Sequence, residues 1–95
     1  MSKERFTSVW DAIEDTNAAA ENMKLRSVLM MSLTDHIRRV GLSQSEAAKL
    51  LGVTQPRVSD LMRGKIGVFG LDALVNMATA AGLQVELHVH EPKAA

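Results

Sequence analysis

The sequence of 95 residues predicts an all-α domain of about five helices, followed by one β-strand. Apolar residues recur at three- and four-residue steps in the first half of the chain, as they do on the buried face of a helix. Glycine, serine and threonine residues that suit helix ends then divide the middle of the chain into short helical segments. Strict alternation of apolar and polar residues near the C-terminus indicates the strand.

The composition is that of a globular protein packed by aliphatic side chains. Hydrophobic residues make up 46% of the chain and aromatic residues only 3%, so Leu, Val, Ala and Met must fill the core, which favours helices. The absence of Cys excludes disulfides, thiolate metal sites and cysteine nucleophiles. The sequence shows neither a membrane-spanning apolar run nor a signal peptide, so we expect a cytoplasmic protein.

The first helix is expected from about Asn17 to Val40, after a polar N-terminal arm over residues 1–16. Its apolar stripe consists of Met23, Leu25, Val28, Leu29, Leu33, Ile37 and Val40. Ser32 and Asp35 can mark a second start, so one long helix and two abutting helices both stay open. Gly41 suits the left-handed position that ends a helix. In the arm, the apolar residues can form a short helical stripe or dock on the body: Phe6, Val9, Trp10 and Ile13.

Two short helices follow, each with its own start signal. Ser43 to Glu46 has the form of a capping box, in which the serine hydroxyl and the glutamate side chain each bind an end amide, and this helix continues through Leu51. Thr54 can cap the next helix, which ends at Arg63-Gly64. Pro56 is harmless there because the amides of a first turn have no partner within the helix.

Residues 44–63 satisfy the steric requirements of a helix-turn-helix motif. The first of the two helices offers small residues where the second leans on it, and Gly52 tolerates a positive φ in the turn. The second helix supplies apolar residues for the inner face. These positions are Ala47, Ala48, Val53, Val58 and Leu61.

A loop over residues 65–70, a helix over residues 71–81 and a stop at Gly82 complete the expected domain, residues 17–82.

A strand over residues 83–90 and a tail over residues 91–95 follow. The apolar row of the strand is Leu83, Val85, Leu87 and Val89, and it alternates with Gln84, Glu86, His88 and His90. Arg5 to Val9 is the only other segment with even a weak strand pattern. A lone strand leaves its backbone groups unpaired, so we expect it to pair with the same strand of a second copy, with the apolar row against the helices, which makes a homodimer.

The charge distribution favours a polyanionic partner, although the net charge is zero. Residues 24–65 hold eight basic and three acidic residues, a balance of +5, whereas residues 1–23 come to −3 and residues 66–95 to −2. A basic middle between acidic ends is typical of a nucleic-acid-binding module with separate surfaces for assembly or partners.

The run from Leu42 to Gly64, LSQSEAAKLLGVTQPRVSDLMRG, resembles the Cro/phage-repressor (XRE) class of helix-turn-helix regulators. The resemblance extends loosely over residues 17–82 as a lambda-repressor-like domain. Over the whole chain it extends to the short XRE regulators paired with toxins, the HigA-type antitoxins. It implies that the second helix of the motif enters the major groove of double-stranded DNA, where base edges are distinguishable.

The resemblance implies a set of DNA-binding residues, namely Gln44, Thr54, Gln55, Pro56, Arg57, Ser59, Asp60, Arg63 and Lys65. Gln44 is expected to clamp a phosphate and Gln55 to bind adenine or a phosphate, while Arg57 is expected to take guanine or the backbone. Arg63 and Lys65 are expected backbone clamps. Pro56 either reads a thymine methyl group or only shapes the helix start.

Asp60 is expected to accept from cytosine or to hold Arg57 or Arg63 in place. We therefore expect a repressor that reads a palindromic operator as a homodimer. The alternative is an antitoxin that mainly neutralises a cognate toxin through residues 1–23 and binds DNA for autoregulation. We expect no enzyme and no cofactor, because the chain has no nucleophile–base pair and little room for a pocket. We also expect no metal, since Glu86, His88 and His90 have no further ligand beside them.

Overall fold

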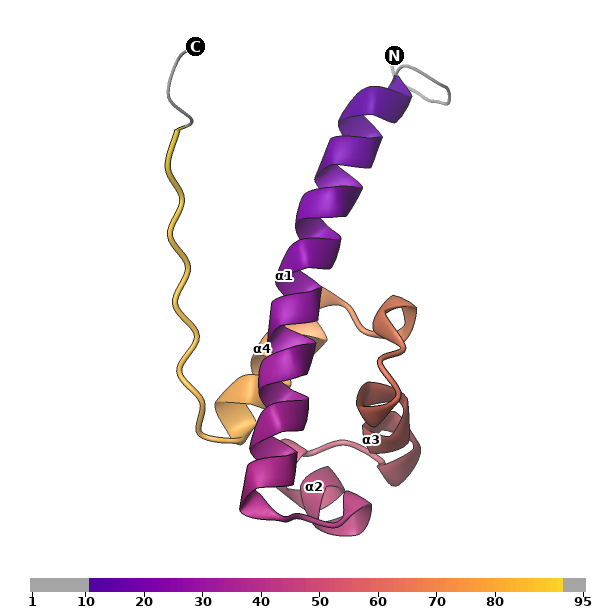
Figure 1. Cartoon of the computed structure of the whole chain (residues 1–95), viewed down its shortest axis with the longest axis vertical. Coiled ribbons are helices and arrows are strands. Elements are labelled where there is room, and N and C mark those ends of the chain that lie inside the picture. Colours follow the sequence, from indigo (N-terminus) through magenta and orange to yellow (C-terminus); the bar gives the residue numbers. More distant parts are fainter. Residues whose placement is uncertain (1–10, 92–95) are drawn as a thin grey trace.

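The helices of the structure follow the local start and stop signals of the sequence closely. The structure is a computed structural model that describes residues 11–91, with side chains from residue 17 onward. Its elements in this range are α1 (Asp11–Val40), α2 (Gln44–Leu51), α3 (Gln55–Met62), the short 3-10 helix η1 (Ile66–Val68) and α4 (Leu71–Ala80). Figure 1 shows α4 beside the C-terminal half of α1, with α2 and α3 on the other side of that half.

Helix α1 is one unbroken helix of 30 residues, which settles the choice between one helix and two. Met30 and Leu33, on either side of the alternative start at Ser32, are both buried in the core, and an unbroken helix keeps both side chains on one face. The helix begins at Asp11 rather than at about Asn17, so residues 11–16 of the expected arm are helical and continuous with the first helix. Residues 1–10, with Phe6, Val9, Trp10 and the weak strand candidate, lie outside the described residues, as does the side chain of Ile13.

The N-terminal half of α1 projects beyond the other helices (Figure 1). The longest dimension of the molecule is 47 Å, close to the roughly 45 Å that a helix of this length spans. The side chains of residues 17–25 are all exposed, and burial begins only with Arg26.

The core is small, aliphatic and shared by all four helices. Its fully buried large side chains are Leu33 of α1, Val58 and Leu61 of α3, and Leu74 of α4. Ala47 of α2 and Phe69, which follows η1, are buried in the same cluster. Since α2 and α3 have only eight residues each, and isolated helices of that length are unstable in water, their packing on α1 and α4 stabilises them.

All four helices end in the same way, with a glycine in the left-handed conformation and a backbone bond from the following residue back to the last turn. The glycines are Gly41, Gly52, Gly64 and Gly82, with φ between 71° and 83°. The backbone bonds run from Leu42 N to Ile37 O (3.1 Å), Val53 N to Ala48 O (3.0 Å), Lys65 N to Asp60 O (3.0 Å) and Leu83 N to Ala78 O (2.9 Å). Three of the four residues after these glycines then pack on the core: Leu42, Val53 and Leu83.

The predicted capping signals are both present. The amide of Glu46 donates to Ser43 Oγ at 3.1 Å, and the amide of Ser43 donates to Glu46 Oε1 at 2.8 Å. Thr54 Oγ1 accepts from the amide of Arg57 at 3.4 Å, and Pro56 lies in the first turn of α3. The bonds from Ser43 hold the pKa of the Glu46 carboxyl below its ordinary value of 4.5.

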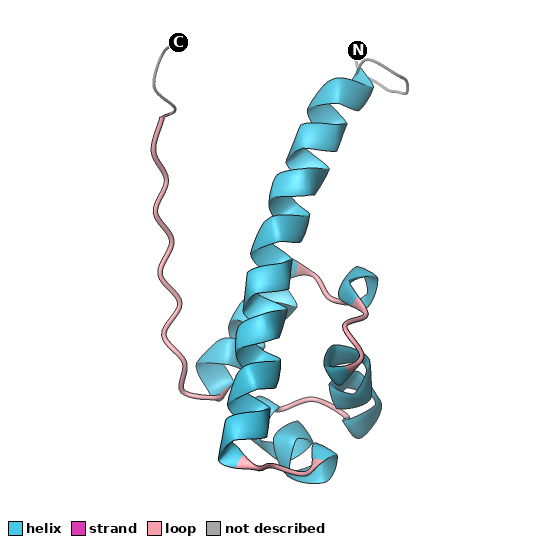
Figure 2. Ribbon diagram, viewed as in Figure 1, coloured by secondary structure: helices cyan, strands magenta, loops and turns pink. Residues whose placement is uncertain are grey.

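The expected C-terminal strand is not formed in the single chain. Residues 83–91 run as an extended segment alongside α1, and Figure 2 shows no strand between residues 11 and 91. The reason is that an extended segment becomes a strand only when another pairs with its backbone. The inward orientation of the apolar row is correct for Leu83, which packs on the core. In the single chain Val85, Leu87 and Val89 are exposed, at 41%, 69% and 87%.

Replacing Gly52 tests the turn of the motif. Gly52→Val should lower the free energy of unfolding by about 2 kcal/mol, because a β-branched residue strongly disfavours positive φ. A Cβ atom added at this position meets no atom within 4 Å, so the loss is attributed to the positive φ of the backbone. Urea denaturation followed by circular dichroism measures it. Gly52→Asn is the matched control and should lose much less, since asparagine tolerates this conformation. Equal denaturation midpoints for Gly52→Val and the wild type would refute this account of the turn.

The capping box predicts a pH dependence of stability. Because folding lowers the pKa of Glu46, its contribution to the free energy of unfolding is complete above pH 4.5 and is lost as the pH falls through the folded-state pKa. The stability difference between the wild type and Glu46→Gln should therefore be constant above that pH and should shrink below it, as measured by urea denaturation from neutral to acid pH. The exposed Glu21 provides the control as Glu21→Gln. A difference that does not change with pH would contradict this role of Glu46.

Candidate nucleic-acid interface

The packing of α2 against α3 leaves one face of both helices open to solvent. Ala47 and Ala48 are the buried residues of α2 on this side, and Val58 and Leu61 are those of α3. Small side chains on α2 allow the two backbones to approach closely. The positions between these buried residues therefore point away from the core, as the helix-turn-helix pattern predicts.

Four of the predicted DNA-binding residues line a single open hollow on this face: Gln44, Gln55, Pro56 and Ser59. Gln44 is the first residue of α2, Gln55 and Pro56 are the first two of α3, and Ser59 lies one turn further along α3. The N-termini of two helices thus meet at this surface. Helix N-termini present unpaired amides and a positive dipole end, which favour an anion such as phosphate.

The side chain of Arg57 points toward the loop after α3. Its Nη1 donates to the carbonyl oxygen of Val68 at 3.0 Å, and the guanidinium lies over the Phe69 ring, 5.0 Å from the centroid. A cation over an aromatic face is attracted by the negative charge of the ring face. The structure thus engages Arg57 within the protein, and its contact with DNA stays a prediction.

The acidic residue of α3 has a different partner from the ones expected. Asp60 Oδ1 lies 3.6 Å from Lys65 Nζ, whereas the expectation was that it holds Arg57 or Arg63. The reason is that the chain turns back after Gly64, and the amide of Lys65 also donates to the Asp60 carbonyl oxygen at 3.0 Å. Arg63 instead donates from Nε and Nη2 to Ser59 Oγ, at 3.3 and 2.8 Å. Arg63 and Lys65 both stay exposed, and Arg63 is bonded to Ser59, which lines the hollow.

Sequence reasoning missed Arg26 of α1. Its Nη1 donates to the carbonyl oxygens of Ile66 and Phe69, at 3.0 and 3.4 Å, across 40 and 43 positions of sequence. Its Nε donates to Asn22 Oδ1 at 2.6 Å. One sequence signal could have revealed it. Arg26 stands four and seven positions before the buried Met30 and Leu33, a spacing that places a charged residue in line with the buried face of the helix.

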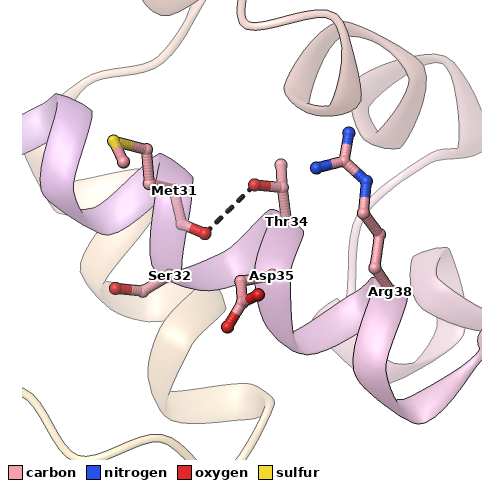
Figure 3. Close-up of a pocket in the computed structure, with 5 residues that line it drawn as sticks. All are labelled: Met31, Ser32, Thr34, Asp35 and Arg38. Atoms are coloured by element: carbon pink, nitrogen blue, oxygen red, sulfur yellow. Dashed lines mark hydrogen bonds between the residues drawn. The ribbon is translucent and has the colours of Figure 1, made fainter.

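A second hollow, on α1, lacks converging groups. It is lined by Met31, Ser32, Thr34, Asp35 and Arg38, all from adjacent turns of one helix (Figure 3). Thr34 Oγ1 donates to the Met31 carbonyl oxygen of the same helix at 3.1 Å. Asp35 pairs with Arg39 at 3.0 Å, and the Arg38 guanidinium points away from Asp35. This hollow is part of an ordinary charged helix surface.

A third hollow is mainly apolar and lies between α1, α4 and the extended C-terminal segment. Its apolar lining comprises Leu25, Val28, Leu29, Leu71, Val75, Val85 and Leu87. Several of these side chains are substantially exposed, and Val28 is exposed to 58%.

The C-terminal segment holds one close pair of a histidine and a glutamate. His88 Nε2 lies 3.9 Å from Glu86 Oε1, but residues 17–91, whose side chains the structure describes, contain no group of three His, Cys, Asp or Glu side chains able to hold a metal ion. Over the same part of the chain, none of the helices combines the length and the apolar character needed to cross a membrane.

The chain is similar to known proteins over most of its length. Residues 12–90 match a family model described as a helix-turn-helix domain. A solved structure assigned to the XRE family of transcriptional regulators is 32% identical, with a TM-score of 0.74, and the match covers 81% of this chain and 90% of that one. No curated protein matches significantly.

Proposed function

The chain belongs to the helix-turn-helix domain family, and from this premise we propose that it is a DNA-binding transcriptional regulator that reads double-stranded DNA with α3. The structural similarity to an XRE family transcriptional regulator supports the same function. The observation that carries the proposal is the hollow shared by Gln44, Gln55, Pro56 and Ser59.

The chemistry of this hollow suits a major groove. A glutamine side chain offers the donor and acceptor pair that matches N6 and N7 of adenine, and the exposed ring of Pro56 offers an apolar contact for a thymine methyl group. Gln44, with the amides at the start of α2, suits a phosphate of the flanking backbone. Thr54 and Ser59 lie at the border of the same surface.

Charged residues flank the hollow on the side where α3 ends. Arg63 is oriented by Ser59, and Lys65 by Asp60. The Lys65 side chain is 50% exposed and that of Asp60 only 26%, so the ammonium group, more than the carboxylate, faces the surroundings. We assign Arg63 and Lys65 to phosphates. Direct base contacts by Arg57 or Asp60 would require these side chains to leave their present partners.

Substitution of Gln55 tests the reading surface. Gln55→Ala should weaken binding to the preferred duplex by about 1–3 kcal/mol and broaden the sequence preference, because a base contact is lost. The duplex is obtained by selection from a randomised library with the wild-type protein, and binding is measured by electrophoretic shift. Asn76→Ala, which removes an exposed amide from α4, is the control. Lys65→Met should weaken binding to all sequences alike and reduce the salt dependence. Unchanged affinity and preference in Gln55→Ala would exclude α3 as the reading element.

We further propose that the protein is a repressor that binds a palindromic operator as a homodimer through residues 83–90. The extended segment has no pairing partner among residues 11–91, and its apolar residues become more exposed from Val85 to Val89. Unpaired backbone groups and an uncovered apolar row favour antiparallel pairing with the same segment of a second copy. That arrangement would place two α3 helices on one face of the DNA, about one helical turn apart.

Substitution of Leu87 tests the dimer. Leu87→Asp should shift the protein to a monomer at tens of micromolar and weaken operator binding with it, because a carboxylate at this position opposes burial of the apolar row. Light scattering coupled to size-exclusion chromatography measures the mass. Gln84→Asp introduces the same charge among the alternating polar positions and should leave the mass unchanged. A wild-type monomer that binds its operator tightly would refute the homodimer.

One observation also favours the antitoxin alternative. Residues 17–25 of α1 all belong to the exposed part of the helix and include apolar side chains, Met23 at 49% and Leu25 at 38%. A projecting helix with exposed apolar residues suits a protein partner. Co-purification with the product of an adjacent short gene, lost on truncation of α1 before Lys24, would support a toxin contact here.

A further inference from the structure

The loop from Lys65 to Gly70 connects α3 to α4 and carries one of the proposed phosphate contacts. It has little regular structure of its own apart from η1, and three glycines stand within or beside it: Gly64, Gly67 and Gly70. Glycine-rich backbone loses much conformational entropy when it is ordered. Lys65 itself is bonded to Asp60 of α3, but the backbone that follows it requires bonds from elsewhere in the protein to be held in one position.

Two arginines from two different helices supply these bonds. Arg26 of α1 donates to the carbonyl oxygens of Ile66 and Phe69, and Arg57 of α3 donates to that of Val68. Three of the loop carbonyls thus accept charge-assisted hydrogen bonds, which are stronger than neutral ones. Phe69 is buried in the core and contacts both arginines, because its carbonyl oxygen accepts from Arg26 and the Arg57 guanidinium lies over its ring.

The geometry of Arg26 is itself supported. Asn22, one turn earlier on α1, accepts from Arg26 Nε at 2.6 Å and orients the guanidinium toward the loop. Arg26 is half-buried, unlike the exposed residues 17–25 that precede it. A lysine could not replace it fully, since a single ammonium group lacks the planar set of donors that reaches Asn22 and two carbonyls together.

We propose that Arg26 is a positioning residue for DNA binding: together with Arg57 it holds the Lys65–Gly70 loop against α3, so that Lys65 is presented beside the reading surface. The inference rests on the proposed DNA-binding function. Arg26 acts through the loop and contacts no base. Arg57 acts from the other side of the loop.

A double-mutant cycle tests the proposal. The variants are Arg26→Met, Lys65→Met and the double variant, with Lys24→Met as the control that removes an exposed charge from the same helix. The probe is the duplex selected from a randomised library by the wild-type protein. Arg26→Met should bind it about tenfold more weakly, the scale expected for lost charge-assisted hydrogen bonds. The double variant should bind no more weakly than the weaker single variant, because both substitutions remove the same contact. Lys24→Met should bind like the wild type.

Affinities that differ from these expectations contradict the proposal, and each kind of difference identifies the step that fails. Wild-type affinity in Arg26→Met would show that the loop needs no clamp. Additive losses in the double variant would show that Arg26 acts independently of Lys65. If Arg26→Met is unfolded by circular dichroism, Arg26→Lys replaces it and should show the same non-additive loss. A wild-type protein that enriches no duplex would remove the proposed function itself, together with this inference.

Selection with Arg57→Met tests the second arginine. A positioning role predicts weaker binding to every sequence and recovery of the same preferred duplex as the wild type. A changed preference at one base position would instead identify Arg57 as a base contact and would remove it from the clamp.

Discussion

The burial of Leu33, Val58, Leu61 and Leu74 is the interaction on which the rest of the structure depends. Each fully buried aliphatic side chain of this kind contributes about 1.5–3 kcal/mol. Helices α2 and α3, with eight residues each, are too short to persist without this packing. The two helices of the motif therefore exist because α1 and α4 cover their inner faces. The functional unit is the whole four-helix domain, although only α2 and α3 form the candidate surface.

Apart from the start of α1, which lies at Asp11 rather than at about Asn17, the helix ends could be predicted from the sequence almost to the residue, because their signals are local. The capping box at Ser43, the cap at Thr54 and the glycine after each helix act within a few residues of the chain. The C-terminal segment could not be predicted in the same way. Alternation from Leu83 to His90 indicates an extended backbone, and the backbone is extended (Figure 2). Whether it becomes a strand depends on a partner that the pattern itself does not specify.

The sequence was sufficient to predict which residues gather at the candidate site. It was not sufficient to predict which hydrogen bonds and ion pairs they form. Spacing on two short helices was sufficient to bring Gln44 and Gln55 to one hollow. It was not sufficient for the charged side chains, whose long stems reach several partners. Asp60 pairs with Lys65, and Arg57 packs on Phe69. These choices depend on where the chain turns after α3. The contact of Arg26 with Ile66 spans 40 positions of sequence. The periodicity of apolar residues predicts local structure and gives no information about contacts so far apart in the chain.

Helix α1 joins an exposed N-terminal part to a C-terminal part that packs in the core. One end of this helix stands free of the body (Figure 1), and the other end supplies Leu33 to the core. Sharp bends in helices arise at proline, at glycine or where a side chain interrupts the backbone ladder, and residues 17–40 contain neither proline nor glycine. We therefore expect α1 to be rigid along its length, with its C-terminal half fixed by the small core. We therefore expect a displacement of the free end to reach the Arg26 guanidinium, and through it the backbone that follows α3, because residues 17–40 offer no hinge that would absorb it.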